Sequence, residues 1–533
     1  MDYERAASFA KLGLENHSNS QGKDAAVNHL NGWGLDHSTE EHRTQEVERI
    51  VDGVLASVRQ PLIDAVTAFF VNPLSPLSLM VFETALLVVV REFGRQLLEA
   101  VLNACEPDQS NLLPKELWFE CGGYTRRNEK TANRSLASRF GDIVLHRRGY
   151  RSWVPGDGSI FPLEMLFGLN HSATPALIDW LGLQMATAGS NQAAVIERLR
   201  TDCGVTMGVK RLRQCVAQLS ASMEEFRQEN QVAVLLKALE QATKSSGSRK
   251  PVIAVGRDGI TLREYEHCAF QVATAGTVSV YDRRGKRLIT VYLAHPPEPG
   301  QATMDAMLTD LLTKLFRLWN GPLPRLAYVT DSGSNETGYF EDVLSRMVHP
   351  ATGERLRWIR VADFYHASER IWKMAELLFG KGTRASNAWA HRMLRLLKKP
   401  NGASRVLHSA ASHFHRLQAT SRKLSKKKQD EYWKAYRYIQ SRTKFMRYSD
   451  YKNVHIPLGS GVTEAACKTV FTQRLKNSGM RWSHEGAKSI LTLRTILLSR
   501  SWSATYNATL KAALPASLRP YQKNSRKNQI TAA

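Results

Sequence analysis

Cysteine pairs are absent from this sequence. Its six cysteines are scattered along the chain, and none of them forms a CxxC pair. The spacing therefore indicates neither a disulfide framework nor a Cys-based zinc site, and it fits a reducing cytoplasm.

Membrane and nucleotide-binding signatures are missing as well. No run of about 18 uncharged apolar residues exists, since the best candidate, residues 79–90, contains Glu83 and is followed by Arg91. The N-terminus is charged and has no apolar run behind it, so we expect no signal peptide. GKGTRAS at 380–386 lacks the glycine spacing and the GK[ST] ending of a P-loop. We therefore expect no membrane partner and no small-molecule substrate.

Acidic residues are scarce relative to basic ones. The 533-residue chain has 49 Asp and Glu against 73 Lys and Arg, a formal net charge of +24. Residues 1–110 carry a net charge of −8, and residues 111–533 carry a net charge of +32. Such an excess predicts a polyanionic partner, with DNA as the natural one. The alternative is a basic surface that serves only solubility.

The length and changes in composition indicate a multidomain α+β protein. Residues 1–43 are polar and are predicted to be disordered, and a helical region suited to oligomerisation follows at 44–110. TKSSGSRKP at 243–251 is the clearest linker. The other predicted parts are a small basic β-rich module (111–165), a helix-turn-helix region (166–242), an α/β domain in two pieces (252–363 and 459–505), the basic helical insertion between these pieces (364–458), and a basic tail (506–533).

The β-rich module interleaves aromatic residues with arginines. Arg126, Arg147 and Arg148 are among these arginines. The pattern fits contacts to a DNA backbone, and it fits equally an ordinary small sheet with a charged outer face.

Residues 190–220 predict two short helices joined by a tight turn at Gly204. A basic second helix after such a turn is typical of helix-turn-helix DNA recognition. Its outward residues would be Lys210, Arg211, Arg213 and Gln214. An ordinary helical hairpin shares the pattern, so both interpretations stay open.

After the linker the hydrophobic period changes to that of strands. The predicted elements are strands at 252–255, 269–281 and 288–293, a helix at 302–319, a strand at 326–330, a helix at 339–347 and a strand at 356–361. Three consecutive strands, then helix, strand, helix and strand, is the order of an RNase H-like domain. In that order the first and fourth strands are parallel neighbours at the centre of the sheet.

Three carboxylates lie where such a fold would bring them together. Asp258 ends the first strand in VGRDG, and Asp331 follows the fourth in YVTDSGSNE. Side-by-side carboxylates are unfavourable unless they share a divalent cation. The best third candidate is Glu464 in GSGVTEAACK, on a helix that Ser460 can cap. Simpler explanations exist, because Asp258 could be a turn residue and Glu464 could pair with Lys468.

Such a cluster fits phosphodiester chemistry. Hydrolysis of a phosphodiester and joining of a 3′-hydroxyl are both in-line displacements at phosphorus, which two Mg²⁺ ions can assist. Mg²⁺ prefers hard oxygen ligands and keeps some of its water. We therefore expect two Mg²⁺ or Mn²⁺ ions held by Asp258, Asp331 and Glu464, and no protein nucleophile.

The segment IPLGSGVTEAACKTVFTQRLKNSGMRWSHEGAKSILTLRTILLSRSW, residues 456–502, resembles the C-terminal signature of bacterial insertion-sequence transposases of the ISKra type, which are related to the ISLre and Mutator-like DDE enzymes. VGRDG and YVTDSGSNE match the two aspartate motifs of this family. DFYHASERIW matches its Asp/Cys-x-x-His motif and places Asp363 and His366 in it. The resemblance covers about residues 80–505, and it implies an RNase H-like catalytic domain with the three carboxylates as Mg²⁺ ligands.

The family motifs also mark auxiliary residues. Asp363 and His366 could orient the site or a DNA phosphate, or Asp363 could cap a helix while His366 pairs locally. Trp482 could contact DNA or belong to the core. The signature residues expected to contact DNA are Lys468, Gln473, Arg474, Lys476, Arg481 and Trp482.

One departure from the family concerns the β-rich module. Relatives often carry cysteine pairs there, whereas RRGYRSWVPGDGSIFPLE has none. Either the module folds without metal or its role in reading DNA is reduced.

The sequence as a whole predicts a cytoplasmic, nucleoid-associated DNA transposase. Residues 111–240 would bind the terminal inverted repeats of double-stranded element DNA, and residues 252–505 would cut the strands and join them to target DNA with Mg²⁺. A homo-oligomer is expected because two ends must be paired. Two other classes stay open: a structure-specific RNase H-like nuclease, and a domesticated, non-catalytic DNA-binding protein.

Overall fold

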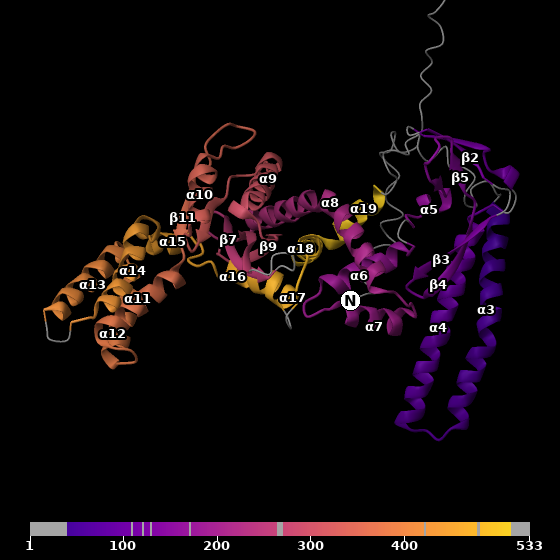
Figure 1. Cartoon of the computed structure of the whole chain (residues 1–533), viewed down its shortest axis with the longest axis horizontal. Helices are drawn as coiled ribbons and strands as arrows, with labels where there is room; N and C mark the ends of the chain where they lie inside the picture. The colour runs from indigo at the N-terminus through magenta and orange to yellow at the C-terminus, as the bar shows by residue number, and fades with distance from the viewer. Residues whose placement is uncertain are drawn as a thin grey trace, which may run out of the picture. The chain divides into compact units, whose positions relative to one another are not determined.

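The computed structural model describes residues 40–107, 110–119, 122–127, 131–169, 172–263, 270–419, 423–476 and 480–512. These residues form a mixed α+β protein that divides into two compact units (Figure 1). Unit 1 comprises Met1–Leu181, Gln192–Cys215 and Ala508–Ala533, and unit 2 comprises Gly182–Asn191 and Val216–Asn507.

Helices extend into both predicted terminal segments. Helix α3 (Glu40–Val71) already includes the last four residues of the segment predicted to be disordered, and residues 1–39 lie outside the described residues. Helix α19 (Trp502–Lys511) runs into the predicted tail, whose residues 513–533 also lie outside them.

In unit 1, α3 and α4 (Pro76–Ala104) form a long helical hairpin (Figure 1). Helix α4 begins with a capping box, in which the side chains of Ser75 and Ser78 each accept the other residue's backbone N–H. Among the described helices, α3 alone has the length and composition of a membrane span, and one such helix is weak evidence for a membrane. Large apolar side chains are exposed around the tip of the hairpin: Phe70, Val71, Leu74, Leu77, Val81, Leu87 and Val88.

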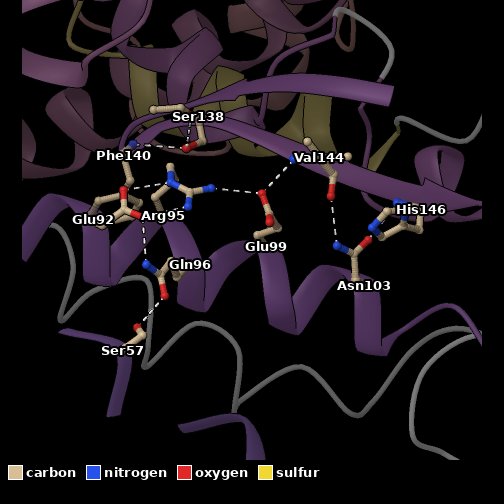
Figure 2. A network of polar contacts seen from close by, with 11 residues as sticks. Ser57, Glu92, Arg95, Gln96, Glu99, Asn103, Ser138, Phe140, Val144 and His146 are labelled. Atoms are coloured by element: carbon tan, nitrogen blue, oxygen red, sulfur yellow. Dashed lines mark hydrogen bonds and ion pairs between the residues drawn. The ribbon is translucent and has the colours of Figure 1, made fainter. Parts of the chain in front are cut away.

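The C-terminal part of α4 is tied to a two-stranded antiparallel sheet of β3 (Ala132–Ser138) and β4 (Gly141–Arg147). Figure 2 shows the contacts. The Glu99 carboxylate accepts the Val144 N–H at 2.8 Å, and the Asn103 amide donates to the Val144 carbonyl at 2.9 Å and accepts the His146 N–H at 2.7 Å. Helix side chains therefore satisfy the backbone groups along the free edge of β4.

The remaining strands of unit 1 form a second antiparallel sheet, and two arginines at the end of β4 and directly after it are internal. Arg147 pairs with Glu164, and Arg148 with Glu106, and all four side chains are buried. Neither arginine can present its charge to a DNA backbone. At these two positions the interleaving of arginines with aromatic residues therefore reflects internal packing and not DNA contact. The sheet order is β1 (Glu116–Phe119), β2 (Gly122–Arg126), β5 (Tyr150–Ser152), β6 (Ser159–Ile160), followed in the chain by α5 (Pro162–Leu166).

The expected pair of helices around Gly204 is present. Helix α6 (Pro175–Ala186) is followed by α7 (Gln192–Cys203) and α8 (Val209–Lys244). Gly204 has a φ of +68°, which a glycine adopts without strain, and this permits the turn. The second helix has 36 residues, so it is much longer than the short helix predicted.

Unit 2 is built on a five-stranded sheet in the order β11-β10-β7-β8-β9. β7, β8 and β9 are antiparallel neighbours, and β10 and β11 run parallel to β7. The predicted succession of strands and helices is confirmed. The strands are β7 (Val252–Arg263), β8 (Phe270–Tyr281), β9 (Arg287–His295), β10 (Arg325–Thr330) and β11 (Trp358–Ala362).

Two differences from the predicted element boundaries affect the candidate site residues. β7 continues to Arg263 because β8 pairs with it over its whole length, so Asp258 lies inside the strand and does not end it. Helix α10 (Ser334–Asp342) begins five residues earlier than predicted, directly after the loop that carries Asp331.

The two faces of the sheet are covered by different helices. Ile253 and Val255 of β7 pack in a core with α9 (Ala302–Leu318) and the second half of α8. Val252 and Ala254 pack in the other core, which includes the predicted helical insertion. The insertion comprises α11 (Phe364–Phe379), α12 (Arg384–Leu397), α13 (Gly402–Gln418), α14 (Lys426–Arg442) and α15 (Tyr448–Asn453).

The C-terminal signature segment is helical and packs back on the sheet. Helix α16 (Gly461–Ala466) lies against β7 at Gly256, where any side chain would collide with Thr463. The hydroxyls of Thr463 and Thr277 of β8 are 2.8 Å apart. A π-helix (η6, Cys467–Thr472), α17 (Gln473–Leu475) and α18 (His484–Leu498) follow.

Candidate functional site

Asp258 and Asp331 come from adjacent strands of unit 2. β7 and β10 are parallel neighbours, as the sequence predicted, with Tyr328 opposite Val255. Three more residues along this register bring Asp331 level with Asp258. The negative charge of Asp331 acts on Asp258 and contributes to raising its pKa, after burial, which is the main cause.

Glu464 approaches Asp258 from α16. Its charge also contributes to the raised pKa of Asp258, so carboxylates from three distant parts of the sequence meet at one edge of the sheet. Ser460 occupies the N-cap position of α16 as predicted, but its hydroxyl does not cap the helix. It lies 2.8 Å from a carboxylate oxygen of Glu464 and 2.7 Å from one of Asp363.

A fourth carboxylate, Glu336, was not predicted. It lies in the first turn of α10 and is buried. Burial raises its pKa, and the charges of Asp331 and Asp258 raise it further. A side chain on Gly333 would collide with the Glu336 carboxylate and would also touch Asp331. The signal was present in YVTDSGSNE, but recognising it required an earlier start for α10.

A buried thiol completes this group. Cys467, at the start of the π-helix, donates to Oδ2 of Asp258 over 3.4 Å. Burial and the nearby carboxylates raise the pKa of this thiol well above its usual range, so it stays protonated and remains a donor. No role was predicted for this cysteine from the sequence, because its neighbour lies on a distant strand.

Asp363 fills both roles that the sequence left open. One carboxylate oxygen accepts the His366 N–H at 2.8 Å and so caps α11. The other oxygen accepts the backbone N–H and the hydroxyl of Ser460. Asp363 is buried and has no solvent-facing oxygen, so it joins α11 to α16 and thereby orients Glu464.

His366 lies between two glutamates. Its Nε2 is 3.7 Å from Oε1 of Glu464, and its Nδ1 is 3.3 Å from Oε2 of Glu369. Ligand atoms of Asp363, His366 and Glu464 all lie within 4.8 Å of one another, close enough to surround one cation. His366 therefore belongs to the same site as Glu464 and does not pair only locally.

The donor set fits a hard divalent cation. The charges of Asp331 and Glu464 act on Asp258, and those of Asp331 and Asp258 act on Glu336. Asp258 and Glu336 have raised pKa values, and such a group is stabilised when a cation offsets the repulsion. Oxygen ligands of this kind suit Mg²⁺ or Mn²⁺, and Asp258, Asp331 and Glu464 are the most accessible of them.

The helix-turn-helix residues predicted to contact DNA belong to unit 1. Lys210, Arg213 and Gln214 are exposed, and Arg213 donates to Gln192 at 2.9 Å. Arg211 is only half-exposed and donates to the Ser172 carbonyl at 2.5 Å, so it is used in packing.

The signature residues of unit 2 divide into exposed and buried ones. Lys468, Lys476 and Arg481 are exposed. Arg474 is fully buried, donates to the Met185 carbonyl at 2.7 Å, and lies over the ring of Trp482. The expectation that Arg474 contacts DNA is therefore wrong, because its guanidinium is enclosed by protein. Trp482 is half-buried and donates to the Leu475 carbonyl at 3.1 Å, so it supports the same packing.

No protein-family model matches this sequence, and no curated protein matches it either.

Proposed function

We propose that this protein is a DNA transposase of the DDE type, similar to the ISKra family, that acts in the cytoplasm on nucleoid DNA. The observation that carries the proposal is the convergence of Asp258, Asp331 and Glu464 at one sheet edge, from segments that match the family motifs. The sheet order, with three antiparallel strands followed by two parallel ones, is the arrangement expected of an RNase H-like domain and supports the same conclusion.

Each residue of the site has a role in the proposed reaction. Bound Mg²⁺ or Mn²⁺ would supply activation of the attacking oxygen and stabilisation of the leaving oxygen. Asp258, Asp331 and Glu464 would hold the cations, and Glu336 would add negative charge to the group. Ser460 and Asp363 would fix the orientation of Glu464, and the Cys467 thiol would fix Asp258.

A basic stripe near the site suits the DNA backbone. His391 and Arg395 of α12, together with Lys398 directly after it, line a hollow of about 450 Å³ and form a basic stripe. The ammonium of Lys398 lies 4.4 Å from the centre of the Phe364 ring, and Phe364 directly follows Asp363 in the chain. This basic stripe therefore leads toward the carboxylates, and phosphates bound along it would approach them.

Self-association is part of the proposal, because two DNA ends must be paired. The exposed apolar tip of the α3–α4 hairpin is the surface we assign to it, with a second copy of the chain as its occupant. No basic residue lies between Arg59 and Arg91, and the segment contains the acidic residues Asp64 and Glu83. Phosphates of DNA and anionic lipids are not attracted by such a surface, whereas a second hairpin would bury it in a four-helix bundle.

The test is strand cleavage on a supercoiled plasmid that carries the DNA flanking the gene. Wild type with Mg²⁺ or Mn²⁺ should make nicks at defined ends and join the 3′-hydroxyls, and Asp331→Asn should bind the plasmid without cutting it. Cleavage at branched or hybrid structures without joining would instead identify a structure-specific nuclease. Binding without cleavage by both proteins would leave a non-catalytic DNA-binding protein.

A further inference from the structure

The loop that carries Asp331 has a conformation that its own sequence does not favour. Ser332 has a φ of +63°, in the left-handed region that residues with a side chain rarely adopt, and it is almost completely buried. The next residue, Gly333, donates its N–H to the Asp331 carboxylate at 3.0 Å. Because the left-handed backbone at Ser332 is unfavourable by itself, surrounding contacts must hold it.

Two side chains of α14 supply these contacts. The Tyr438 hydroxyl donates to the backbone carbonyl of Asp331 at 3.0 Å, and Arg442 donates to the backbone carbonyl of Ser332 at 2.8 Å. Tyr438 and Arg442 are four residues apart and so lie on one face of the helix. The loop is therefore held at two successive carbonyl groups by one rigid element.

The two donors also hold each other in place. The Arg442 guanidinium lies 4.2 Å from the centre of the Tyr438 ring, and the Arg370 guanidinium, from α11, lies 5.1 Å from the centre of the same ring. The cations over the ring further restrict its orientation.

The neighbouring strand is supported in the same way. The Tyr448 hydroxyl donates to the Ala362 carbonyl at 2.8 Å, and the Tyr451 hydroxyl donates to the Arg360 carbonyl at 3.2 Å. Ala362 ends β11 and directly precedes Asp363. Tyrosines of the insertion thus bind backbone carbonyls at or near the ends of both parallel strands from which Asp331 and Asp363 emerge.

We propose that Tyr438 and Arg442 are positioning residues for Asp331, and that the helical insertion is a structural part of the cation site. Their hydrogen bonds keep the Asp331–Ser332 backbone in the conformation that places the Asp331 carboxylate level with Asp258. The insertion would then do more than present basic residues to DNA. This inference rests on the proposed function only in taking Asp331 as a cation ligand.

The variants are Tyr438→Phe, which removes one hydroxyl, and Arg442→Lys, which keeps the charge but loses the planar donor group. The matched control is Tyr436→Phe on the same helix, because the Tyr436 hydroxyl has no hydrogen-bond partner among the described residues, while its ring packs on Tyr432 and Trp433. All measurements use the full chain.

The first measurement is Mn²⁺ binding by electron paramagnetic resonance. Tyr438→Phe and Arg442→Lys should each weaken binding by roughly tenfold, as expected for groups that orient a ligand, and Tyr436→Phe should bind as wild type does. The same variants should need correspondingly more Mg²⁺ for half-maximal cleavage. Wild-type Mn²⁺ affinity in both variants would overturn the proposal.

The second measurement is amide hydrogen exchange of the peptide that contains residues 331–335, without metal. Exchange should be at least about tenfold faster in Tyr438→Phe than in Tyr436→Phe, because the loop loses an anchor. Equal exchange in the two variants would refute the positioning role even if wild type bound no Mn²⁺. Absence of Mn²⁺ binding by wild type, with faster exchange in Tyr438→Phe, would count against the proposed function and leave the role of α14 in holding the loop supported.

Discussion

Asp363 and Glu464 meet at a single hydroxyl group, that of Ser460, which lies 2.7 Å from the first carboxylate and 2.8 Å from the second. A serine hydroxyl has one proton, so it can donate fully to only one of the two at a time. The backbone N–H of Ser460 also binds Asp363. The start of α16, and with it Glu464, is therefore held by a buried residue of a different segment.

Replacing this hydroxyl should impair the site more than the fold. Ser460→Ala should reduce metal-dependent cleavage by roughly tenfold or more and lower the free energy of unfolding by about 1–2 kcal/mol. Ser489→Ala is the control, because that hydroxyl bonds only within α18. Plasmid nicking and urea unfolding measure the two effects, and a Ser460→Ala protein that nicks at the wild-type rate would contradict the assigned role.

Glu336 should make stability depend on pH. Its pKa is raised in the folded protein, mainly by burial, so the folded state holds this proton more tightly than the unfolded state does. The stability it contributes is complete below the usual pKa of about 4.5 and is lost as the pH rises through the raised value. In metal-free buffer, Glu336→Gln should therefore lose less stability between pH 5 and pH 8 than wild type.

Denaturant unfolding at these two pH values, with and without Mg²⁺, measures the effect of Glu336. Asp258 has a raised pKa as well and stays in the variant, so a smaller dependence should remain. Mg²⁺ should stabilise wild type at pH 8 by offsetting the repulsion among the carboxylates. The same pH dependence in both proteins would show that Glu336 does not titrate as its position implies.

The basic stripe of α12 should bind DNA phosphates. Arg395→Ala and Lys398→Ala should each weaken duplex binding and reduce the slope of log affinity against log salt by about one unit. Arg317→Ala is the control, since Arg317 is exposed at the end of α9, which covers the other face of the sheet. Fluorescence anisotropy across a range of salt concentrations provides the test, and unchanged slopes in both stripe variants would exclude this surface.

Arg474 should matter for stability and not for DNA binding. Burial lowers its pKa to about 10, and it bonds to the Met185 carbonyl inside the protein. Arg474→Ala should cost about 2–4 kcal/mol of unfolding free energy, because it opens a cavity and breaks an internal hydrogen bond. The salt dependence of DNA binding by Arg474→Ala should match that of wild type. Arg481→Ala, at an exposed position, should instead lower the slope of log affinity against log salt. A normal melting temperature for Arg474→Ala would contradict the packing role.

The α3–α4 hairpin should determine the assembly state. Leu87→Glu and Val88→Glu place charge on exposed apolar positions, so the monomer should fold normally while self-association is lost. Light scattering should then give the mass of one chain for Leu87→Glu and for Val88→Glu. Wild type should give a multiple of that mass, and so should the control Val47→Glu, at an exposed position nearer the start of α3. A wild-type monomer that floats with lipid vesicles would show that a membrane, and not a second copy, covers this surface.

The sequence by itself determined the strand order of unit 2 and the adjacency of Asp258 and Asp331. Both follow from local information, because apolar alternation marks each strand and the succession of strands and helices limits how they pair. Capping of α11 by Asp363 was likewise among the expected roles, since a cap depends on residues three apart. The helical character of the insertion was also predicted, because the apolar period of a helix is a local property of the sequence.

Only the tertiary structure decided which side chains surround the carboxylates. Cys467 and Tyr438 reach the site through contacts between distant segments, and Glu336 reaches it because α10 starts earlier than its sequence predicted. The burial of Arg474 and the diversion of the Ser460 hydroxyl from its helix also depend on what lies across the fold. A sequence pattern records the period of a helix or strand but not the partner that packs against it, and the enclosure and charge of a site are properties of those partners.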